Sequence, residues 1–71
     1  MKYVIGEKIL FNDKKYYVAD VAIYEEIEYY FVFESDTGKG YKILYEEDGR
    51  MHQIIKFDNY EKLLNLFEGD N

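Results

Sequence analysis

The sequence predicts an α+β fold in which a small antiparallel β-sheet of about five strands is followed by one C-terminal amphipathic α-helix packed on one face. Three observations support this prediction. Turn-forming residues recur roughly every eight to twelve residues, a spacing typical of short antiparallel strands. A segment near the middle of the chain has side chains that alternate with a period of two, as in a strand. The last part of the chain instead places apolar residues at helical spacing.

The chain is short, and we expect a single globular domain over residues 1–71. A domain of this size buries only about 60% of its unfolded surface, and the sequence has no Cys to form a disulfide. Nine Tyr and five Phe are therefore expected to supply much of the core, at roughly 150–250 Å² each. A second subunit is another source of burial, so the sequence does not decide between a monomer and a homodimer.

The first two strands are expected at Ile9–Phe11 and Lys15–Tyr24. Between them, Asn12, Asp13 and Lys14 form a turn, because Asn and Asp tolerate left-handed dihedral angles. The alternation of the second strand is interrupted in the segment VADV, residues 18–21. We interpret this interruption as a β-bulge.

The third strand, Ile27–Ser35, follows a turn at residues 25–26 and has the clearest alternation in the chain. One face is expected to be core, and the other is expected to point outward. The outward face has apolar residues between acids, which is the anatomy of a binding patch. Packing inside a strongly curled sheet is the alternative for that face. The core set is Ile27, Tyr29, Phe31 and Phe33, and the outward set is Glu28, Tyr30, Val32 and Glu34.

The fourth and fifth strands are expected at Tyr41–Glu46 and Met51–Phe57. Asp48-Gly49 between them is a strong hairpin signal, which fits either a two-residue turn or a three-residue loop. The two possibilities differ by one residue in register and would bury opposite faces. The sequence leaves both open.

The helix is expected to begin after Asp58, because Asp58 and Glu61 form a capping-box-like pair. Gly69 is placed to end it. The apolar stripe of the helix is Tyr60, Leu63, Leu64 and Phe67. A small SH3-like barrel with a terminal helix is the nearest alternative to an open sheet.

The segment Asp36-Thr37-Gly38 resembles the catalytic tripeptide of pepsin-like and retroviral proteases. That chemistry needs two aspartates that share a proton, and the flanking residues here depart from the pattern of those families. Gly38-Lys39-Gly40 is no phosphate-binding loop, because no Gly-x-x-x-x-Gly-Lys-Ser/Thr pattern and no following helix exist. We therefore interpret residues 36–40 as a hairpin loop, expect no catalytic residues, and do not expect an enzyme.

The net charge of −6 belongs entirely to the segment from Tyr16 to Gly38, which has no Lys or Arg. This segment is either a solvated hairpin or a surface that attracts a basic protein. Direct nucleic-acid binding is not expected, because phosphate contacts need clustered Lys and Arg. The predicted partner-binding residues are Asp20, Glu25, Glu26, Glu28, Tyr30, Val32, Glu34 and Asp36.

Metal and cofactor sites are not expected. Neighbouring carboxylates such as Glu25-Glu26 and Glu46-Glu47 would point to opposite faces of a strand, and His52 is the single His. No stretch approaches the roughly 20 apolar residues of a membrane span, and the N-terminus lacks the apolar core of a signal peptide. We expect a cytoplasmic protein without membrane contact.

In size, acidity, Tyr content and antiparallel architecture, the chain resembles the small inhibitors that phages carry against bacterial defence systems, anti-CRISPR proteins among them. That resemblance implies a non-enzymatic protein whose acidic face occupies a basic, nucleic-acid-binding surface of another protein. The alternative is a structural or regulatory domain that self-associates through its sheet face.

Overall fold

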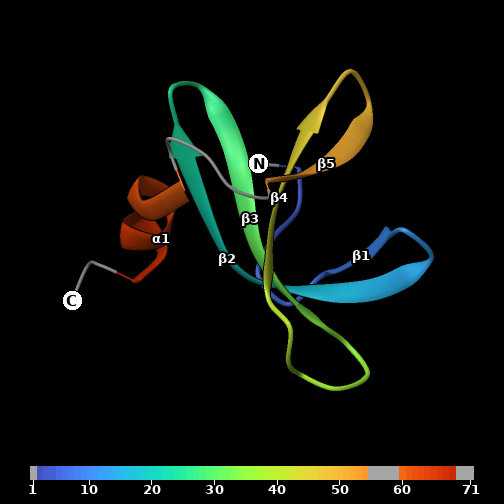
Figure 1. Cartoon of the computed structure of the whole chain (residues 1–71). Helices are drawn as coiled ribbons and strands as arrows, with labels where there is room; N and C mark the ends of the chain where they lie inside the picture. The colour runs from blue at the N-terminus through green and yellow to red at the C-terminus, as the bar shows by residue number, and fades with distance from the viewer. Residues whose placement is uncertain (1, 55–59, 69–71) are drawn as a thin grey trace.

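The computed structural model describes residues 2–54 and 60–68. Five strands form one sheet in the order β1-β2-β3-β4-β5, and each neighbouring pair is antiparallel. Figure 1 shows this meander curled into a half-barrel, with the helix α1 on one side. The predicted fold class is therefore confirmed. The elements are β1 (Lys8–Phe11), β2 (Lys14–Tyr24), β3 (Ile27–Glu34), β4 (Lys42–Glu47), β5 (Arg50–Ile54) and α1 (Tyr60–Glu68).

Three of the connections are two-residue turns in which both residues have positive φ: residues 12–13, 25–26 and 48–49. The strand pairs that close them are Phe11 with Lys14, Tyr24 with Ile27, and Glu47 with Arg50. Such turns are common in hairpins because their twist matches that of the flanking strands. The Asp48-Gly49 hairpin therefore uses the shorter of the two loops that the sequence allowed.

The predicted bulge in β2 is also confirmed. The register between β2 and β3 pairs Val18 with Val32 and then Asp20 with Phe31, so one residue of β2 is extra. An extra residue reverses which side chains face inward: Val18 lies in the interior before the bulge, and Val21 packs against the same cluster after it. A bulge also bends the strand and increases its twist. This bend allows the long β2 strand to curl the sheet.

Curling buries the sheet on both faces. The cluster inside the curl consists of Ile9, Tyr16, Val18, Tyr30, Val32 and Leu44. The cluster on the opposite face consists of Tyr29, Ile43 and Leu63, and Leu63 comes from α1. Tyr3, from the segment before β1, packs against the inner cluster. Its ring contacts the ring of Tyr30 edge to face, with 5.3 Å between the ring centroids.

The prediction that Tyr30 and Val32 point outward is wrong. These side chains are 1% and 0% exposed, because the curl of the sheet encloses the middle of that face. The alternative, packing inside a strongly curled sheet, describes this face correctly. On the predicted core face, Tyr29 is buried and Phe31 is half-buried, whereas Ile27 near the hairpin tip is 38% exposed.

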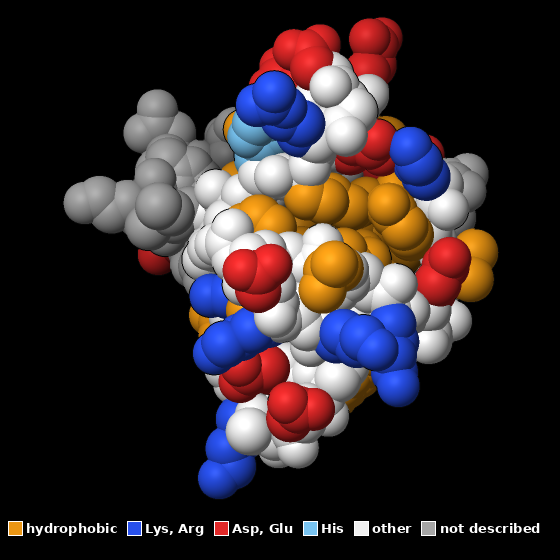
Figure 2. All heavy atoms as spheres, turned by 90° about the vertical axis from the view of Figure 1, so that its right-hand side faces the viewer, with side chains coloured by type: hydrophobic (Ala, Val, Ile, Leu, Met, Phe, Trp, Pro, Cys, Tyr) orange, Lys and Arg blue, Asp and Glu red, His pale blue; other side chains and the backbone are white. Residues whose placement is uncertain are grey.

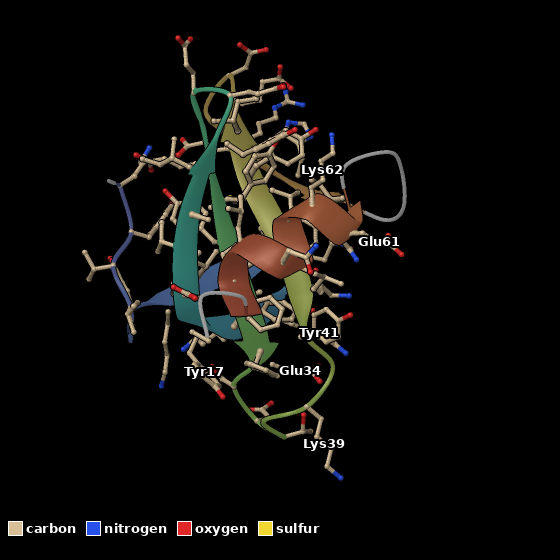
Figure 3. All side chains as sticks on the ribbon, turned by 90° about the vertical axis from the view of Figure 1, so that its left-hand side faces the viewer. Tyr17, Glu34, Lys39, Tyr41, Glu61 and Lys62 are labelled. Carbon is tan, nitrogen blue, oxygen red and sulfur yellow. The ribbon has the colours of Figure 1, made fainter. Side chains whose placement is uncertain are left out.

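The helix covers the face of β3 that was predicted to be core. Leu63 is fully buried, Leu64 and Phe67 pack against the same cluster, and the Phe67 ring stacks on Phe31 at 5.2 Å. Figure 3 shows α1 lying across the sheet, with the labelled Glu61 and Lys62 directed away from it. The residues predicted to bound the helix, Asp58 and Gly69, lie outside the described residues, as do the last three predicted residues of the fifth strand.

The half-barrel is open on the side where β1 and β5 form the two edges of the sheet. Figure 2 views this side and shows hydrophobic side chains at its centre, with charged side chains around them. A closed barrel would pair these two strands, and in residues 2–54 and 60–68 the sheet order does not.

A candidate acidic binding cleft

Two hairpin tips lie at the same end of the sheet, because alternate turns of a meander lie at the same end. One is the turn at residues 25–26 and the other is the turn at residues 48–49, and Figure 1 shows both tips at the top of the molecule. Between them is a cleft of about 370 Å³. Its lining residues are Glu26, Glu28, Tyr30, Glu46, Asp48 and Gly49. Acidic side chains gather at the same end in Figure 2.

The floor of the cleft is a Tyr–Glu pair on β3. The Tyr30 hydroxyl donates a hydrogen bond of 2.5 Å to Oε1 of Glu28. Burial raises the pKa of Tyr30 to about 12, and the Glu28 carboxylate contributes to this rise. The same hydrogen bond, followed by one from the backbone N–H of Lys2, lowers the pKa of Glu28. The carboxylate of Glu28 is therefore held in its charged form and in a fixed orientation.

A basic residue bridges the two central strands of the cleft. The ammonium of Lys2 lies 2.8 Å from Oε2 of Glu46 on β4, and the backbone N–H of Lys2 donates to Oε1 of Glu28 at 3.2 Å. The hydrogen bond to Glu46 raises the pKa of Lys2. The register of β3 and β4 pairs Tyr29 with Tyr45, and Glu28 and Glu46 come one residue beyond that pair, nearer the tips. Lys2 thus contacts one carboxylate on each of the two strands.

The predicted partner-binding residues do not form one surface. Four of them lie at the cleft end: Glu25 and Glu26 are exposed, Glu28 is half-buried, and Tyr30 is buried beneath them. Asp20 sits at the bulge, where its Oδ1 accepts from the N–H of Val21 at 2.8 Å. Val32 is in the inner core.

The last two predicted residues lie at the other end of the sheet. Glu34 forms an ion pair of 3.0 Å with Lys14, which lowers the pKa of Glu34. Asp36 is exposed in the loop between β3 and β4. The segment from Tyr16 to Gly38 has no Lys or Arg of its own, but strand pairing brings Lys14 beside Glu34 and supplies a counter-charge.

Sequence reasoning missed three residues of the cleft: Lys2, Glu46 and Asp48. A signal for two of them was available. In a five-strand meander, the second and fourth turns share one end of the sheet, so the acidic segment before Gly49 had to lie beside Glu25 and Glu26. The position of Lys2 follows from tertiary packing of Tyr3 and had no comparable signal.

The loop that contains Asp36-Thr37-Gly38 has the backbone hydrogen bonds and dihedral angles of a turn. The N–H of Gly38 donates to the carbonyl of Glu34 at 2.8 Å, and the N–H of Lys39 donates to the Thr37 hydroxyl at 3.0 Å. Gly38 and Gly40 have φ of 70° and 64°, which are left-handed values that favour glycine. Figure 3 shows Lys39 at the outer end of this loop, away from the helix.

Residues 2–54 and 60–68 contain no group of three or more His, Cys, Asp or Glu side chains placed to hold a metal ion. The ring of His52 stacks on that of Tyr45 at 5.2 Å, in a directly paired position of β4 and β5. In the same part of the chain, no helix has the length and apolar character needed to cross a membrane.

No protein-family model matches the chain, and comparisons with curated proteins and with solved structures also return no significant match.

Proposed function

We propose that this chain is a non-enzymatic binding protein that uses the acidic end of its sheet to engage a basic surface of another protein. The observation that supports this proposal is the cleft between the two hairpin tips, in which carboxylates from β3, β4 and both turns converge. The carboxylates of this end are Glu25, Glu26, Glu28, Glu46, Glu47 and Asp48, and the basic residues beside them are Lys2 and Arg50.

The arrangement works against folding at the turn. Glu25 and Glu26 both have left-handed φ, of 51° and 70°, in a turn that favours Asn and Gly. Neutral turn residues such as Asn-Gly would serve folding better at these two positions. Binding of a basic partner supplies a reason for the carboxylates at this end.

The chemistry of the surface favours a protein partner over a nucleic acid. Phosphate groups would be repelled by this end of the sheet, whereas a protein surface rich in Lys and Arg would be attracted to it before contact. Surfaces that bind nucleic acids are rich in Lys and Arg. The narrower form of our proposal is that the partner is a nucleic-acid-binding protein of a bacterial defence system, with the chain acting as a phage or mobile-element inhibitor.

The test compares two variants with equal change in net charge. In the first, Glu25 and Glu26 are both changed to Lys, and in the second, Asp36 and Glu61, which are exposed and distant from the cleft, are both changed to Lys. Each variant is used to recover partners from the native host, and association rates are then measured at about 0.05 M and 0.5 M salt. We expect partner binding to be lost only in the first variant and to slow with salt in the parent. Equal binding by both variants would assign the acidic end to solubility alone.

A second candidate function is self-association through the open side of the half-barrel. The observation that favours it is the edge strand β1, on which Leu10 is 66% exposed. An unpaired edge is a template for another strand. Sedimentation equilibrium of the parent and of Leu10→Lys tests this candidate, which requires a salt-insensitive dimer that the substitution dissociates.

A further inference from the structure

The edge strand β1 has backbone groups that point away from the sheet. Figure 1 shows β1 on the side of the molecule opposite α1, and the sheet order places it at an edge. In an antiparallel pair, alternate residues exchange hydrogen bonds with the neighbouring strand, and the residues between them direct their N–H and C=O groups to the other side. Phe11 and Lys14 close a two-residue turn, which makes them the first hydrogen-bonded pair. Ile9 and Glu7 follow at alternate positions, and the N–H of Val18 donates to the carbonyl of Glu7 at 2.9 Å.

The residues between these positions, Lys8 and Leu10, therefore direct their backbone groups to the free edge. The carbonyl of Lys15, which is paired with Leu10, accepts from the N–H of Ser35 at 2.9 Å and so points toward β3. This is expected of a pair that exchanges no hydrogen bonds. Within residues 2–54 and 60–68, neither Lys8 nor Leu10 has a backbone hydrogen bond outside the strand pairing. An extended peptide is the group that satisfies such a row of donors and acceptors.

The side chains beside this edge combine one apolar group with two lysines. Ile9 belongs to the inner cluster, so its neighbours Lys8 and Leu10 lie on the opposite face. Leu10 is 66% exposed, and its partner on β2 is Lys15, which shares that face. Lys8 and Lys15 are both exposed, and neither forms an ion pair with a described residue. A strand added here therefore meets an exposed leucine with two free positive charges beside it.

We propose that β1 binds an extended acidic segment of another protein, which adds to the sheet as a sixth strand, antiparallel like every other pair of this sheet. An apolar side chain of the segment packs on Leu10, and carboxylates on the same face pair with Lys8 and Lys15. Apolar pairs and opposite charges across antiparallel strands are stabilising. This surface is separate from the acidic cleft and selects the opposite charge, so the inference goes beyond the proposed function and does not depend on it.

Charge distinguishes this occupant from a second copy of the chain. Two β1 strands that pair with each other form an isologous contact, in which the same patch of each copy meets itself. Lys8 and Lys15 of both copies would then share one interface, where like charges repel. An acidic segment turns the same lysines into attractive contacts. The lysines therefore disfavour pairing between two β1 strands, as lysines on edge strands commonly do, and favour an acidic strand.

The test is an NMR titration at low salt with an acetylated and amidated peptide, Thr-Glu-Thr-Val-Thr-Glu-Thr. When its central Val lies opposite Leu10 in an antiparallel pair, one Glu lies opposite Lys8. We expect the amide signals of Lys8 and Leu10 to shift and their hydrogen exchange to slow. The analogue with Lys in place of both Glu should bind at least about threefold more weakly. Unchanged amides of Lys8 and Leu10, or equal binding of the two peptides, would overturn the proposal.

Two singly N-methylated forms of the Glu peptide test whether its backbone pairs with β1. Methylation of the central Val removes a donor that faces β1, and methylation of the Thr before it removes a donor that faces away. We expect the first form to bind at least about fivefold more weakly than the second. Equal affinities would mean that the lysines attract the peptide without strand addition, and the proposal would be rejected.

Two variants with equal charge change test the lysine. Lys8→Glu reverses a charge at the edge, and Lys62→Glu reverses one on the exposed surface of α1. Only Lys8→Glu should weaken binding of the Glu peptide, by about threefold or more, and strengthen binding of the Lys peptide. Equal effects of the two variants would contradict the proposal. Protection of the Leu10 amide that rises with protein concentration without any peptide would assign this edge to a second copy and would also overturn it.

Discussion

The hydroxyl of Tyr30 and the carboxylate of Glu28 are joined by a 2.5 Å hydrogen bond between residues two apart on the same strand. The aromatic ring of this pair belongs to the inner core, and the carboxylate belongs to the cleft. The pair thus connects the stability of the fold to the orientation of a candidate binding residue.

The first prediction separates these two roles. Tyr30→Ala should lower the free energy of unfolding by about 3–5 kcal/mol, as for other buried aromatic residues. Tyr30→Phe should lower it by about 1–3 kcal/mol, because the ring stays packed while the hydrogen bond to a charged group is lost. Urea unfolding measures both. Tyr30→Phe also releases Glu28 from this hydrogen bond, so partner binding should weaken in the folded variant, and unchanged binding would show that the fixed orientation of Glu28 does not matter to the partner.

The second prediction concerns alkaline pH. The pKa of Tyr30 in the folded chain, about 12, is above its ordinary value of 10. The phenol therefore stabilises the fold fully below pH 10, and this contribution is lost as the pH rises from 10 toward 12. The difference in unfolding free energy between the parent and Tyr30→Phe should shrink over that interval. A difference that stays constant from pH 9 to pH 12 would contradict the raised pKa.

The third prediction compares two leucines of α1. Leu63 is fully buried, whereas Leu66 is 46% exposed. Leu63→Ala should lower the free energy of unfolding by about 2–5 kcal/mol, which is a large part of the stability of a domain this small. Leu66→Ala should change it by less than about 0.5 kcal/mol. Thermal melts of the two variants should differ clearly, and similar melting temperatures would mean that α1 does not close the core.

The fourth prediction concerns the turn at residues 25–26. Replacement of Glu25-Glu26 by Asn-Gly provides the residue pair that this turn geometry favours. We expect the free energy of unfolding to rise by about 1 kcal/mol, because Asn and Gly tolerate the positive φ of these two positions better than Glu does. Partner binding should fall in the same variant, because two carboxylates are lost. A less stable Asn-Gly variant would show that the glutamates do not strain the turn.

The fifth prediction concerns the loop between β3 and β4. Asp36 is exposed in a turn, so Asp36→Asn should change the free energy of unfolding by less than about 1 kcal/mol. We also expect no peptidase activity at acid pH in the parent. Acid-pH cleavage of a peptide library by the parent, lost in Asp36→Asn, would contradict the interpretation of this loop as a turn.

The strands and the helix could be predicted from the sequence because their signals are local. Turn residues at 12–13 and 48–49 marked the hairpins, the interrupted alternation in β2 marked the bulge, and the apolar spacing around Leu63 marked the helix. The faces of β3 could not be assigned correctly, because periodicity separates two faces and does not say whether both are buried. The acids at the ends of the outward set made that face look exposed, whereas the curl of the sheet encloses its centre at Tyr30 and Val32.

The candidate site was predicted only in part for a related reason. Glu25, Glu26 and Glu28 were identified from a charge count along the chain, and a count of that kind follows sequence neighbours. The cleft is formed between neighbouring hairpins, so half of its charge comes from Glu46 and Asp48, which lie about twenty residues later in the chain. The same count treated Glu34 as part of a segment without basic residues, although its partner Lys14 lies just before that segment.

The open meander also has a consequence for how quickly the chain can fold. Each strand pairs with the strand next to it in sequence, and the two edge strands, β1 and β5, are not joined to each other. A closed barrel of the same strands would need one pairing between the two ends of the chain, and such pairings raise the contact order and slow folding. Here every hairpin can form from a local turn, three of them with only two residues. We expect folding in the faster range for β-rich domains, with docking of α1 following assembly of the sheet.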